Sequence, residues 1–274
     1  MEDEELQALL RENPAQSSRE LATQLGVGQS TVLSHLKTLG KVQKEGRWVP
    51  HKLSEAAVIS RLSVCESLLT RHKRKSFLPN IVTGDEKWLF YDNPQRKKQW
   101  LDPGEAARPT PKRNVHGKKV MLCIWWDQQG VLYYEVLQPN ETVTGERYAS
   151  QLTTLAEKLD EERPWSGKGR RKVILQHDNA RPHVASASRD TVNKLGWEIL
   201  PHPAYSPDIA PSDYHLFRSM QHELEGRQFK EVAEVRKWVH DWIASKNEFF
   251  FYRGIHMLPE RWAKVIESDG HYFS

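Results

Sequence analysis

Cysteine is scarce in this chain, whose 274 residues include only two, Cys65 and Cys123. Two cysteines so far apart in the sequence provide neither a disulfide framework nor the paired spacing of a structural zinc site. We therefore expect two buried or incidental thiols in a reducing compartment.

Long apolar runs are missing as well. No stretch approaches the roughly 20 apolar residues that a membrane-spanning helix needs, and the N-terminus has no signal-peptide core. The sequence also lacks internal repeats, low-complexity segments, a glycine-rich phosphate loop and a nucleophile elbow. These absences exclude several common classes of enzyme and membrane protein, and they predict a soluble intracellular protein.

Charge of one sign does not dominate the chain, because 40 basic residues face 36 acidic ones. The distribution is more informative than the net charge of +4. Between Lys37 and Lys75 there are ten Lys or Arg residues and only three Glu residues. Such a run is most often a solvated face. This one lies between a possible helix-turn-helix and the domain that contains the candidate metal ligands described below, and that position favours a track for nucleic-acid phosphates.

The first forty residues predict three short helices. A leucine stripe over residues 6–10 has helical spacing, and Ser17 with Glu20 has the form of a capping box that opens a second helix. Gly26 ends that helix, and residues 30–36 begin a third. Helix, glycine-containing turn and helix is the pattern of a helix-turn-helix, although an ordinary three-helix bundle would share it.

In a DNA-binding helix-turn-helix, the third helix places polar side chains in the major groove. Val32, Leu33 and Leu36 are then expected to pack inward. The candidate DNA-contact residues are Gln29, Ser30, Thr31, Ser34, His35 and Lys37, together with Arg19 on the preceding helix.

From Phe77 the hydrophobic pattern becomes that of an α/β domain. Strands are predicted over residues 81–91, 119–126, 131–137, 172–176 and 197–200, and helices over 144–159, 184–195 and 213–224. A further helix is predicted before this domain, over residues 53–69. Strands that first form a meander and then alternate with helices predict a mixed sheet flanked by helices. We therefore divide the chain into a small all-α helix-turn-helix domain (1–40), a basic linker (41–76) and an α/β domain (77–274).

Three aspartates in the predicted α/β domain are candidate metal ligands. Asp85 lies within the first strand, Asp178 follows a short apolar strand, and Asp213 opens a helix. Taken singly, each is better explained as a turn residue or a helix cap. Together they fall at ends or edges of elements in one domain, so we expect them to converge. Carboxylates suit hard cations such as Mg²⁺, and two such ions support in-line displacement at phosphorus.

Four histidines offer an alternative metal site, namely His177, His183, His202 and His215. No pair of them has the local spacing of a structural zinc site or of an HExxH-type site. Metal-assisted hydrolysis or transfer with carboxylate ligands remains the favoured chemistry.

Several motifs follow one another in a recognisable order. They are Trp48-Val49-Pro50-His51, Thr83-Gly84-Asp85-Glu86-Lys87-Trp88, Tyr91-Asp92-Asn93-Pro94, His116-Gly117-Lys118-Lys119-Val120, Ile124-Trp125-Trp126, His177-Asp178-Asn179-Ala180-Arg181-Pro182-His183, and Tyr205-Ser206-Pro207-Asp208 running on to Pro211-Ser212-Asp213-Tyr214-His215. Because these motifs stand in this order, the sequence resembles the mariner family of transposases. The resemblance covers nearly the whole chain, from Ser17 to Phe273.

The resemblance implies an RNase H-like catalytic domain in which Asp85, Asp178 and Asp213 hold two Mg²⁺ or Mn²⁺ ions. Residues 179–212, which are 34 in number, separate the last two aspartates. This is the family's spacing, and it favours Asp213 over Asp208 as the third ligand. Asp208 would then shape the loop.

Such transposases cut the ends of their own element with a water nucleophile and join the freed 3′-hydroxyls to target DNA at TA dinucleotides. The implied partners are double-stranded DNA, as terminal inverted repeats and TA target, and a second copy of the chain. The proline-rich and basic segment Asp92–Val115 resembles the loop that clamps the partner subunit. No membrane and no small-molecule cofactor are expected. The basic pentad 71–75 is open to three interpretations, a nuclear-localisation signal, a phosphate contact or a solvated helix end, and we expect the nucleus as the compartment.

Two departures from the family pattern concern DNA binding. Family members carry two helix-turn-helix modules, and this sequence matches only the second. Lys52 also stands where the linker motif usually has an acidic residue. We expect impaired recognition of transposon ends, because loss of phosphate contacts lowers affinity steeply. The alternative function is a non-catalytic DNA-binding protein derived from a transposase, which would use Ser30, Thr31 and His35 with the basic connector.

Overall fold

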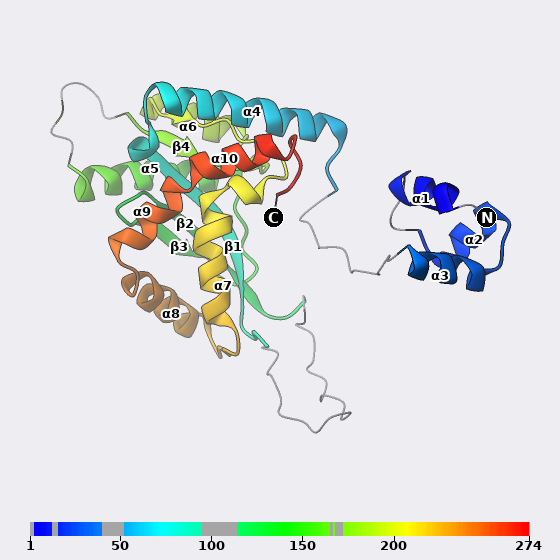
Figure 1. The fold of residues 1–274 in the computed structure, drawn as a ribbon. Coiled ribbons are helices and arrows are strands. Elements are labelled where there is room, and N and C mark those ends of the chain that lie inside the picture. The colour runs from blue at the N-terminus through cyan, green and yellow to red at the C-terminus, as the bar shows by residue number, and fades with distance from the viewer. Residues whose placement is uncertain are drawn as a thin grey trace. The chain divides into compact units, whose positions relative to one another are not determined.

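The computed structural model describes residues 3–12, 16–39, 52–94, 114, 116–164, 167 and 172–273. The chain divides into two compact units, Met1–Val49 and Pro50–Ser274 (Figure 1). The linker motif at residues 48–51 and residues 95–113 of the predicted clamp segment lie outside the described residues.

The smaller unit contains the three predicted helices, α1 (Asp3–Glu12), α2 (Ser18–Leu25) and α3 (Gln29–Thr38). The capping box is present: the Glu20 N–H donates to Ser17 Oγ at 3.3 Å, and the Ser17 N–H donates to Glu20 Oε2 at 2.7 Å. Gly26 ends α2 in the left-handed region, with φ of 63°. The core of this unit is formed by Leu6, Leu21, Ala22 and Val32.

One packing prediction for the third helix is wrong. Val32 is fully buried, as expected, but Leu33 is 51% exposed. Successive residues of a helix point about 100° apart, so a helix this short can bury only a narrow stripe. Leu33 consequently lies on the outer surface of α3 together with exposed Ser30, Ser34 and Lys37.

The larger unit is built on a mixed five-stranded sheet, as predicted. Its strands are β1 (Ile81–Phe90), β2 (Lys119–Trp126), β3 (Val131–Val136), β4 (Ile174–Gln176) and β5 (Glu198–Ile199). Their order across the sheet is β3-β2-β1-β4-β5. The first three strands form an antiparallel meander, and β4 and β5 add in parallel beside β1. β4 begins at Ile174, two residues later than the sequence predicted.

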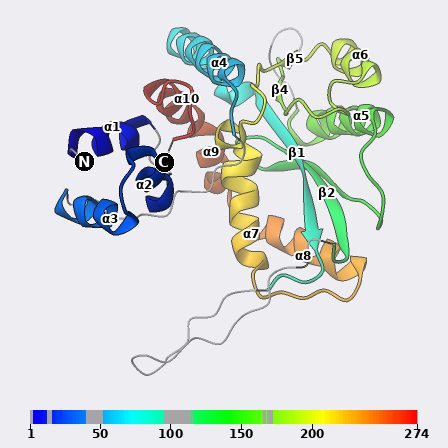
Figure 2. The same cartoon turned by 90° about the vertical axis from the view of Figure 1, so that its right-hand side faces the viewer.

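Helices cover both faces of this sheet (Figure 2). Their bounds are α4 Glu55–Arg74, α5 Gly145–Glu162, α6 Ser186–Leu195, α7 Arg218–Leu224, α8 Val232–Ala244, α9 Glu248–His256 and α10 Leu258–Glu267. α5 and α6 pack on one face, where Tyr148, Leu152 and Val192 join the core. α4 and α7 to α10 pack on the other, with α4 and α10 side by side. The described residues contain no helix long and apolar enough to cross a membrane.

The central strands are buried because both faces of the sheet are covered. In β2 the run from Leu122 to Trp126 is fully buried, which fits the continuous apolar pattern of a strand inside an α/β sheet. The sequence-based prediction placed no element after residue 224. α8, α9 and α10 enlarge the core with Val239, Ile255 and Trp262, all of which are buried.

The predicted helix over residues 213–224 has an unexpected first part. Ser212–Phe217 is a π-helix, and α7 follows it directly. Side chains on these wider turns bond to α9: the Tyr214 hydroxyl donates to the Gly254 carbonyl at 2.7 Å, and His215 Nε2 donates to the Phe250 carbonyl at 2.8 Å. π-Helical turns are rare and occur often at functional sites. Here the π-helix carries Asp213.

Candidate active site

Asp85 and Asp178 come from neighbouring parallel strands. Thr83 of β1 pairs with Gln176 of β4, and each aspartate lies two residues beyond that pair. Asp85 continues along β1, whereas Asp178 follows the last residue of β4. The register therefore brings both residues to the same end of β4. A small hollow at this place is lined by Thr83, Gly84, Asp85, Gln176, His177, Asp178, His202, Ala210 and Ser212.

Asp213 reaches the same end of the sheet from the π-helix. Its neighbour Ser212 lines the hollow, and the Ser212 hydroxyl accepts a hydrogen bond of 3.1 Å from the indole N–H of Trp126 on β2. Asp213 is close enough for its charge to act on Asp85. The three aspartates that the sequence singled out thus lie within reach of one another's charges, and two of them, Asp85 and Asp178, line the same hollow.

Two of these carboxylates are costly to ionise. Burial raises the pKa of Asp85 well above its usual range, and the charges of Asp213 and Glu86 raise it further. Burial also raises the pKa of Asp213 to about 6, against the opposing charge of Lys87 and with a further contribution from Asp178. Neighbouring carboxylates raise one another's pKa because like charges disfavour ionisation. A bound divalent cation would offset this repulsion.

The donor set fits a hard divalent cation. Mg²⁺ and Mn²⁺ prefer carboxylate oxygens, and Mg²⁺ usually keeps several waters while taking only one or two carboxylates and the phosphates of a substrate. Asp85, Asp178 and Asp213 are the residues that would hold such an ion. Within the described parts of the chain, no three His, Cys, Asp or Glu side chains are already gathered as a metal cage.

Asp178 is held by its surroundings although its side chain is 52% exposed. Burial of the carboxyl would raise its pKa, but hydrogen bonds from His183 and from the Ala180 N–H leave the pKa below its usual value. The Ala180 N–H donates to Asp178 Oδ1 at 2.9 Å. Asp178 is therefore also the turn residue that its sequence context suggested.

His183 occupies a position that the sequence did not predict. Its ring is 1% exposed and lies between two carboxylates, with Nδ1 2.8 Å from Asp178 Oδ1 and Nε2 3.1 Å from Glu86 Oε1. The sequence suggested only a zinc-ligand role for this histidine. Glu86 and His183 are 97 positions apart, so no local spacing reveals their contact. The one sequence signal for a role at this site is that Glu86 lies in the same motif as Asp85 and His183 in the same motif as Asp178.

Asp208, the rival third ligand, is engaged elsewhere. Its two carboxylate oxygens accept hydrogen bonds from the guanidinium of Arg61, at 2.8 and 2.6 Å. The Asp208 carbonyl accepts a further bond of 2.7 Å from Arg261. These contacts fix the loop before Asp213.

The glycine next to Asp85 is required by close packing. A Cβ atom on Gly84 would lie 2.2 Å from Cδ1 of Trp125, whose ring is fully buried on the neighbouring strand. Gly84 therefore allows the Trp125 ring to pack directly against β1 beside Asp85. This explains the glycine of the first aspartate motif and one tryptophan of the Trp-Trp motif.

The candidate DNA-contact residues of the smaller unit differ in their contacts. Arg19 on α2 and Ser30, Thr31, Ser34 and Lys37 on α3 are exposed. Two further candidates also bond within the unit. Gln29 Nε2 donates to Ser18 Oγ at 2.9 Å, and His35 Nδ1 lies 2.6 Å from Asp3 Oδ1.

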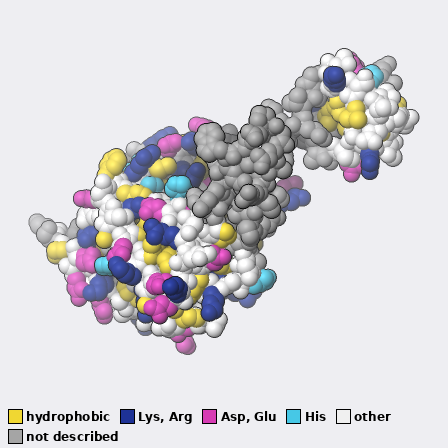
Figure 3. All heavy atoms as spheres, turned by 90° about the horizontal axis from the view of Figure 1, so that it is seen from below, with side chains coloured by type: hydrophobic (Ala, Val, Ile, Leu, Met, Phe, Trp, Pro, Cys, Tyr) yellow, Lys and Arg dark blue, Asp and Glu magenta, His cyan; other side chains and the backbone are white. Residues whose placement is uncertain are grey.

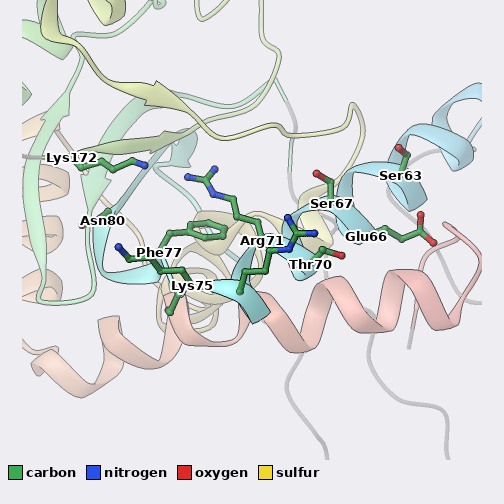
Figure 4. Close-up of a pocket in the computed structure, with 11 residues that line it drawn as sticks. Ser63, Glu66, Ser67, Thr70, Arg71, Lys75, Phe77, Asn80 and Lys172 are labelled. Carbon is green, nitrogen blue, oxygen red and sulfur yellow. The ribbon is translucent and has the colours of Figure 1, made fainter.

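Part of the predicted basic track surrounds a hollow of the larger unit (Figure 4). Arg71, Arg74 and Lys75 at the end of α4 line it together with Lys172, and its other walls include Ser67, Thr70, Phe77 and Asn80. Arg71 and Lys172 both pair with Glu198. On the face shown in Figure 3, by contrast, acidic and basic side chains of this unit are interspersed.

Comparison with known proteins gives a consistent result. Residues 90–168 match a family described as transposase (partial DDE domain). The chain is 54% identical over 271 residues to the Mariner Mos1 transposase of Drosophila mauritiana, covering 99% of this chain and 79% of that protein. It is 41% identical over 273 residues to the histone-lysine N-methyltransferase SETMAR of Homo sapiens, covering all of this chain and 40% of that protein.

Solved structures of Mos1 transposase are similar to this structure over its full length. The paired-end complex with the left transposon end superposes with a TM-score of 0.85, and the paired-end complexes with Mg and with Mn give 0.86 and 0.85. Each is 54% identical in sequence and covers 100% of this chain and 80% of that chain.

Proposed function

The chain belongs to the mariner family of transposases, and we propose that it uses Asp85, Asp178 and Asp213 as the catalytic carboxylates of a cut-and-paste DNA transposition reaction. The observation that supports this proposal is that the three aspartates lie near enough for their charges to act on one another. Two of them have raised pKa values, caused by burial and by the charges of neighbouring carboxylates. Such clusters of perturbed groups are typical of functional sites.

The proposed cofactor is Mg²⁺ or Mn²⁺, with two ions in each active site. Structures of the related Mos1 transposase were determined with each of these metals. When bound, such ions activate the attacking oxygen and stabilise the leaving oxygen of a phosphoryl transfer. The chain itself contributes the anionic oxygens. It also fixes their positions through the pairing of β1 with β4 and through the Trp126–Ser212 hydrogen bond beside Asp213.

The proposed substrate is double-stranded DNA, first as transposon ends and then as target DNA containing TA. The exposed surface of α3 supports this role, because Ser30, Ser34 and Lys37 lie together there at helical spacing. Leu33 shares that surface, and an apolar side chain in the major groove can contact a thymine methyl group. The basic hollow at Arg74 and Lys75 is proposed as an additional contact for DNA phosphates.

A dimer that bridges two transposon ends and a location in the nucleus complete the proposal. Dimerisation is supported by the paired-end complexes of Mos1 transposase. The expected weakness in recognising transposon ends stays a prediction.

Strand nicking tests the proposed catalytic site. The substrate is a duplex carrying the terminal repeats of the chain's own element, supplied with Mg²⁺ or Mn²⁺. The unaltered chain is expected to nick this duplex, and Asp178→Ala to abolish nicking. Asp160→Ala, which alters an exposed aspartate on α5, serves as the matched control and is expected to nick normally. Absence of nicking by every variant would favour the non-catalytic DNA-binding alternative.

A further inference from the structure

The side chain of His183 links two carboxylates that come from different parts of the fold. Glu86 belongs to β1, and Asp178 follows β4. Nε2 of His183 lies 3.1 and 3.2 Å from the two carboxylate oxygens of Glu86. Nδ1 lies 2.8 Å from Oδ1 of Asp178 and 3.2 Å from the carbonyl oxygen of the same residue.

Both ring nitrogens of His183 are used in this arrangement. Carboxylate oxygens accept hydrogen bonds, and a ring nitrogen that carries a proton donates them. Nδ1 faces Asp178 and Nε2 faces Glu86, so the ring joins the two carboxylates through its opposite edges.

Neighbouring aromatic rings keep the imidazole from turning. His177 stacks on His183 with ring centroids 4.9 Å apart and an angle of 3° between the planes. Tyr148 lies against the same ring at 4.2 Å, and its hydroxyl is 2.6 Å from Nδ1 of His177. A buried ring packed in this way presents its two nitrogens in fixed directions.

The hydrogen-bond network around His183 also reaches Asp85. The backbone N–H of Glu86 donates to Oδ1 of Asp85 at 2.8 Å, while the side chain of Glu86 contacts His183. A continuous path of contacts therefore runs from Asp85 through Glu86 and His183 to Asp178. This path links β1 to the turn after β4. The backbone pairing of these two strands ends earlier, at Thr83 and Gln176.

We propose that His183 is a positioning residue that holds the half-exposed Asp178 in the orientation needed for metal binding, with Glu86 orienting the ring from its other side. This inference rests on the proposed function, because it takes Asp178 as a metal ligand. Groups that hydrogen-bond to metal ligands fix their orientation, and altering them costs about 10–100-fold in metal affinity or activity. Without His183, the hydrogen bond that the turn itself gives to the Asp178 carboxylate is the one from the Ala180 N–H.

Two substitutions at His183 separate its two contacts. The amide nitrogen of Asn occupies nearly the position of Nδ1, so His183→Asn keeps a donor toward Asp178 and loses the donor toward Glu86. The amide nitrogen of Gln mimics Nε2, so His183→Gln keeps the contact with Glu86 and loses the one with Asp178. A purely structural role would favour Gln, since it fills more of the buried space.

The experiment is a titration of the full chain with Mn²⁺ alone, followed by the electron paramagnetic resonance signal of free Mn²⁺. Asp178→Ala is included, and unfolding midpoints in a chelator show that each variant is folded. We expect His183→Gln to weaken Mn²⁺ binding about 10–100-fold and His183→Asn to keep most of the affinity. Equal affinities for folded Asn and Gln variants, or weaker binding by Asn, would overturn the proposal. His256→Gln, which alters a histidine bonded to Gln128, should bind Mn²⁺ normally.

A second pair of variants covers the case in which the His183 variants do not fold. Glu86→Gln and Glu86→Ala remove the same negative charge, but only Gln keeps an oxygen acceptor for Nε2. We expect Glu86→Gln to bind Mn²⁺ more tightly than Glu86→Ala, and equal binding would contradict a positioning role. If Asp178→Ala binds Mn²⁺ as the unaltered chain does, the proposed function itself fails. If Asp178→Ala loses binding and the His183 and Glu86 pairs show no difference, only the positioning role fails.

Discussion

Arg61 and Asp208 form a buried, bidentate ion pair that fastens α4 to the loop leading to Asp213. Nη1 and Nη2 of Arg61 each donate to one carboxylate oxygen of Asp208, at 2.8 and 2.6 Å. The remaining donors are also used, since Nε bonds to the Gly270 carbonyl and Nη1 to the Ser206 hydroxyl, both at 2.8 Å. A fully buried guanidinium is tolerated because its donors are satisfied.

Arg61→Met is expected to destabilise the chain by about 3–5 kcal/mol, because it leaves the Asp208 carboxylate without its counter-ion in a largely buried place. Urea unfolding followed by tryptophan fluorescence measures this change. Asp208→Asn in the Arg61→Met background removes the stranded charge and should recover part of the loss. Strictly additive effects of the two substitutions would contradict the ion pair as the cause.

Prediction from sequence succeeded where the relevant pattern is local. The run from Lys119 to Trp126 is uniformly apolar after its first residue, and β2 has those bounds. The Ser17–Glu20 capping box concerns neighbours three residues apart, and both of its hydrogen bonds are present. The three aspartates were singled out because each lies in a short motif of unusual residues, and their catalytic role stays a prediction.

Prediction failed where a contact joins distant parts of the chain. Arg61 and Asp208 are 147 positions apart, and nothing near either residue indicates its partner. Glu86 and His183 are 97 positions apart, and the sole indication of their contact is that each lies in a motif with a candidate aspartate. Leu33 was misplaced because helical spacing alone does not decide which of two adjacent apolar residues faces a very small core.

Asp85→Asn should separate stability from activity. Burial and neighbouring carboxylates raise the pKa of Asp85, so the folded state resists its ionisation. Its raised pKa implies that stability is lost as the pH rises above the unfolded pKa toward the folded one. The neutral amide removes this cost. Without metal at neutral pH we therefore expect an equal or higher melting temperature together with loss of nicking.

A melting temperature for Asp85→Asn well below that of the unaltered chain would contradict this account. Calorimetry in a chelator provides the measurement. Asp160→Asn on the surface of α5 is the matched control, and it should leave both stability and nicking unchanged.

Gly84→Ala is expected to destabilise the larger unit by about 1–3 kcal/mol, as overpacking of a filled core usually does. The new methyl group would lie 2.2 Å from the Trp125 ring, which is fully buried and packs against Tyr133 and Tyr148. Chemical denaturation gives the free energy of unfolding. Combining Gly84→Ala with Trp125→Leu should cost less than the sum of the two single changes. Full additivity would show that the ring is not the obstacle.

The two thiols should be inert in the folded chain. Burial raises the pKa of both Cys65 and Cys123 to about 12, and both side chains are fully buried. Only the thiolate reacts with disulfide reagents, so neither cysteine should react at mildly alkaline pH until the chain is unfolded. A colorimetric thiol assay with and without guanidinium provides the measurement. Rapid reaction of a thiol in the native protein would contradict the described burial.

Removing the cations of the basic hollow should lower the salt dependence of DNA binding. Arg71 and Lys172 share Glu198, whereas Arg74 and Lys75 have no carboxylate partner among the described ion pairs. Each phosphate contact contributes about 0.9 to the slope of log K against log salt concentration. The double variant Arg74→Gln, Lys75→Gln should therefore show a smaller slope in gel-shift titrations with duplex DNA. Its affinity should fall by similar factors for different sequences, because phosphate contacts carry no base information.

Lys237→Gln is the control: it removes an exposed cation of α8 that pairs with Asp241, and it should leave the slope unchanged. An unchanged slope in the double variant would show that the cations of this hollow do not contact DNA and that α4 ends in an ordinary solvated surface.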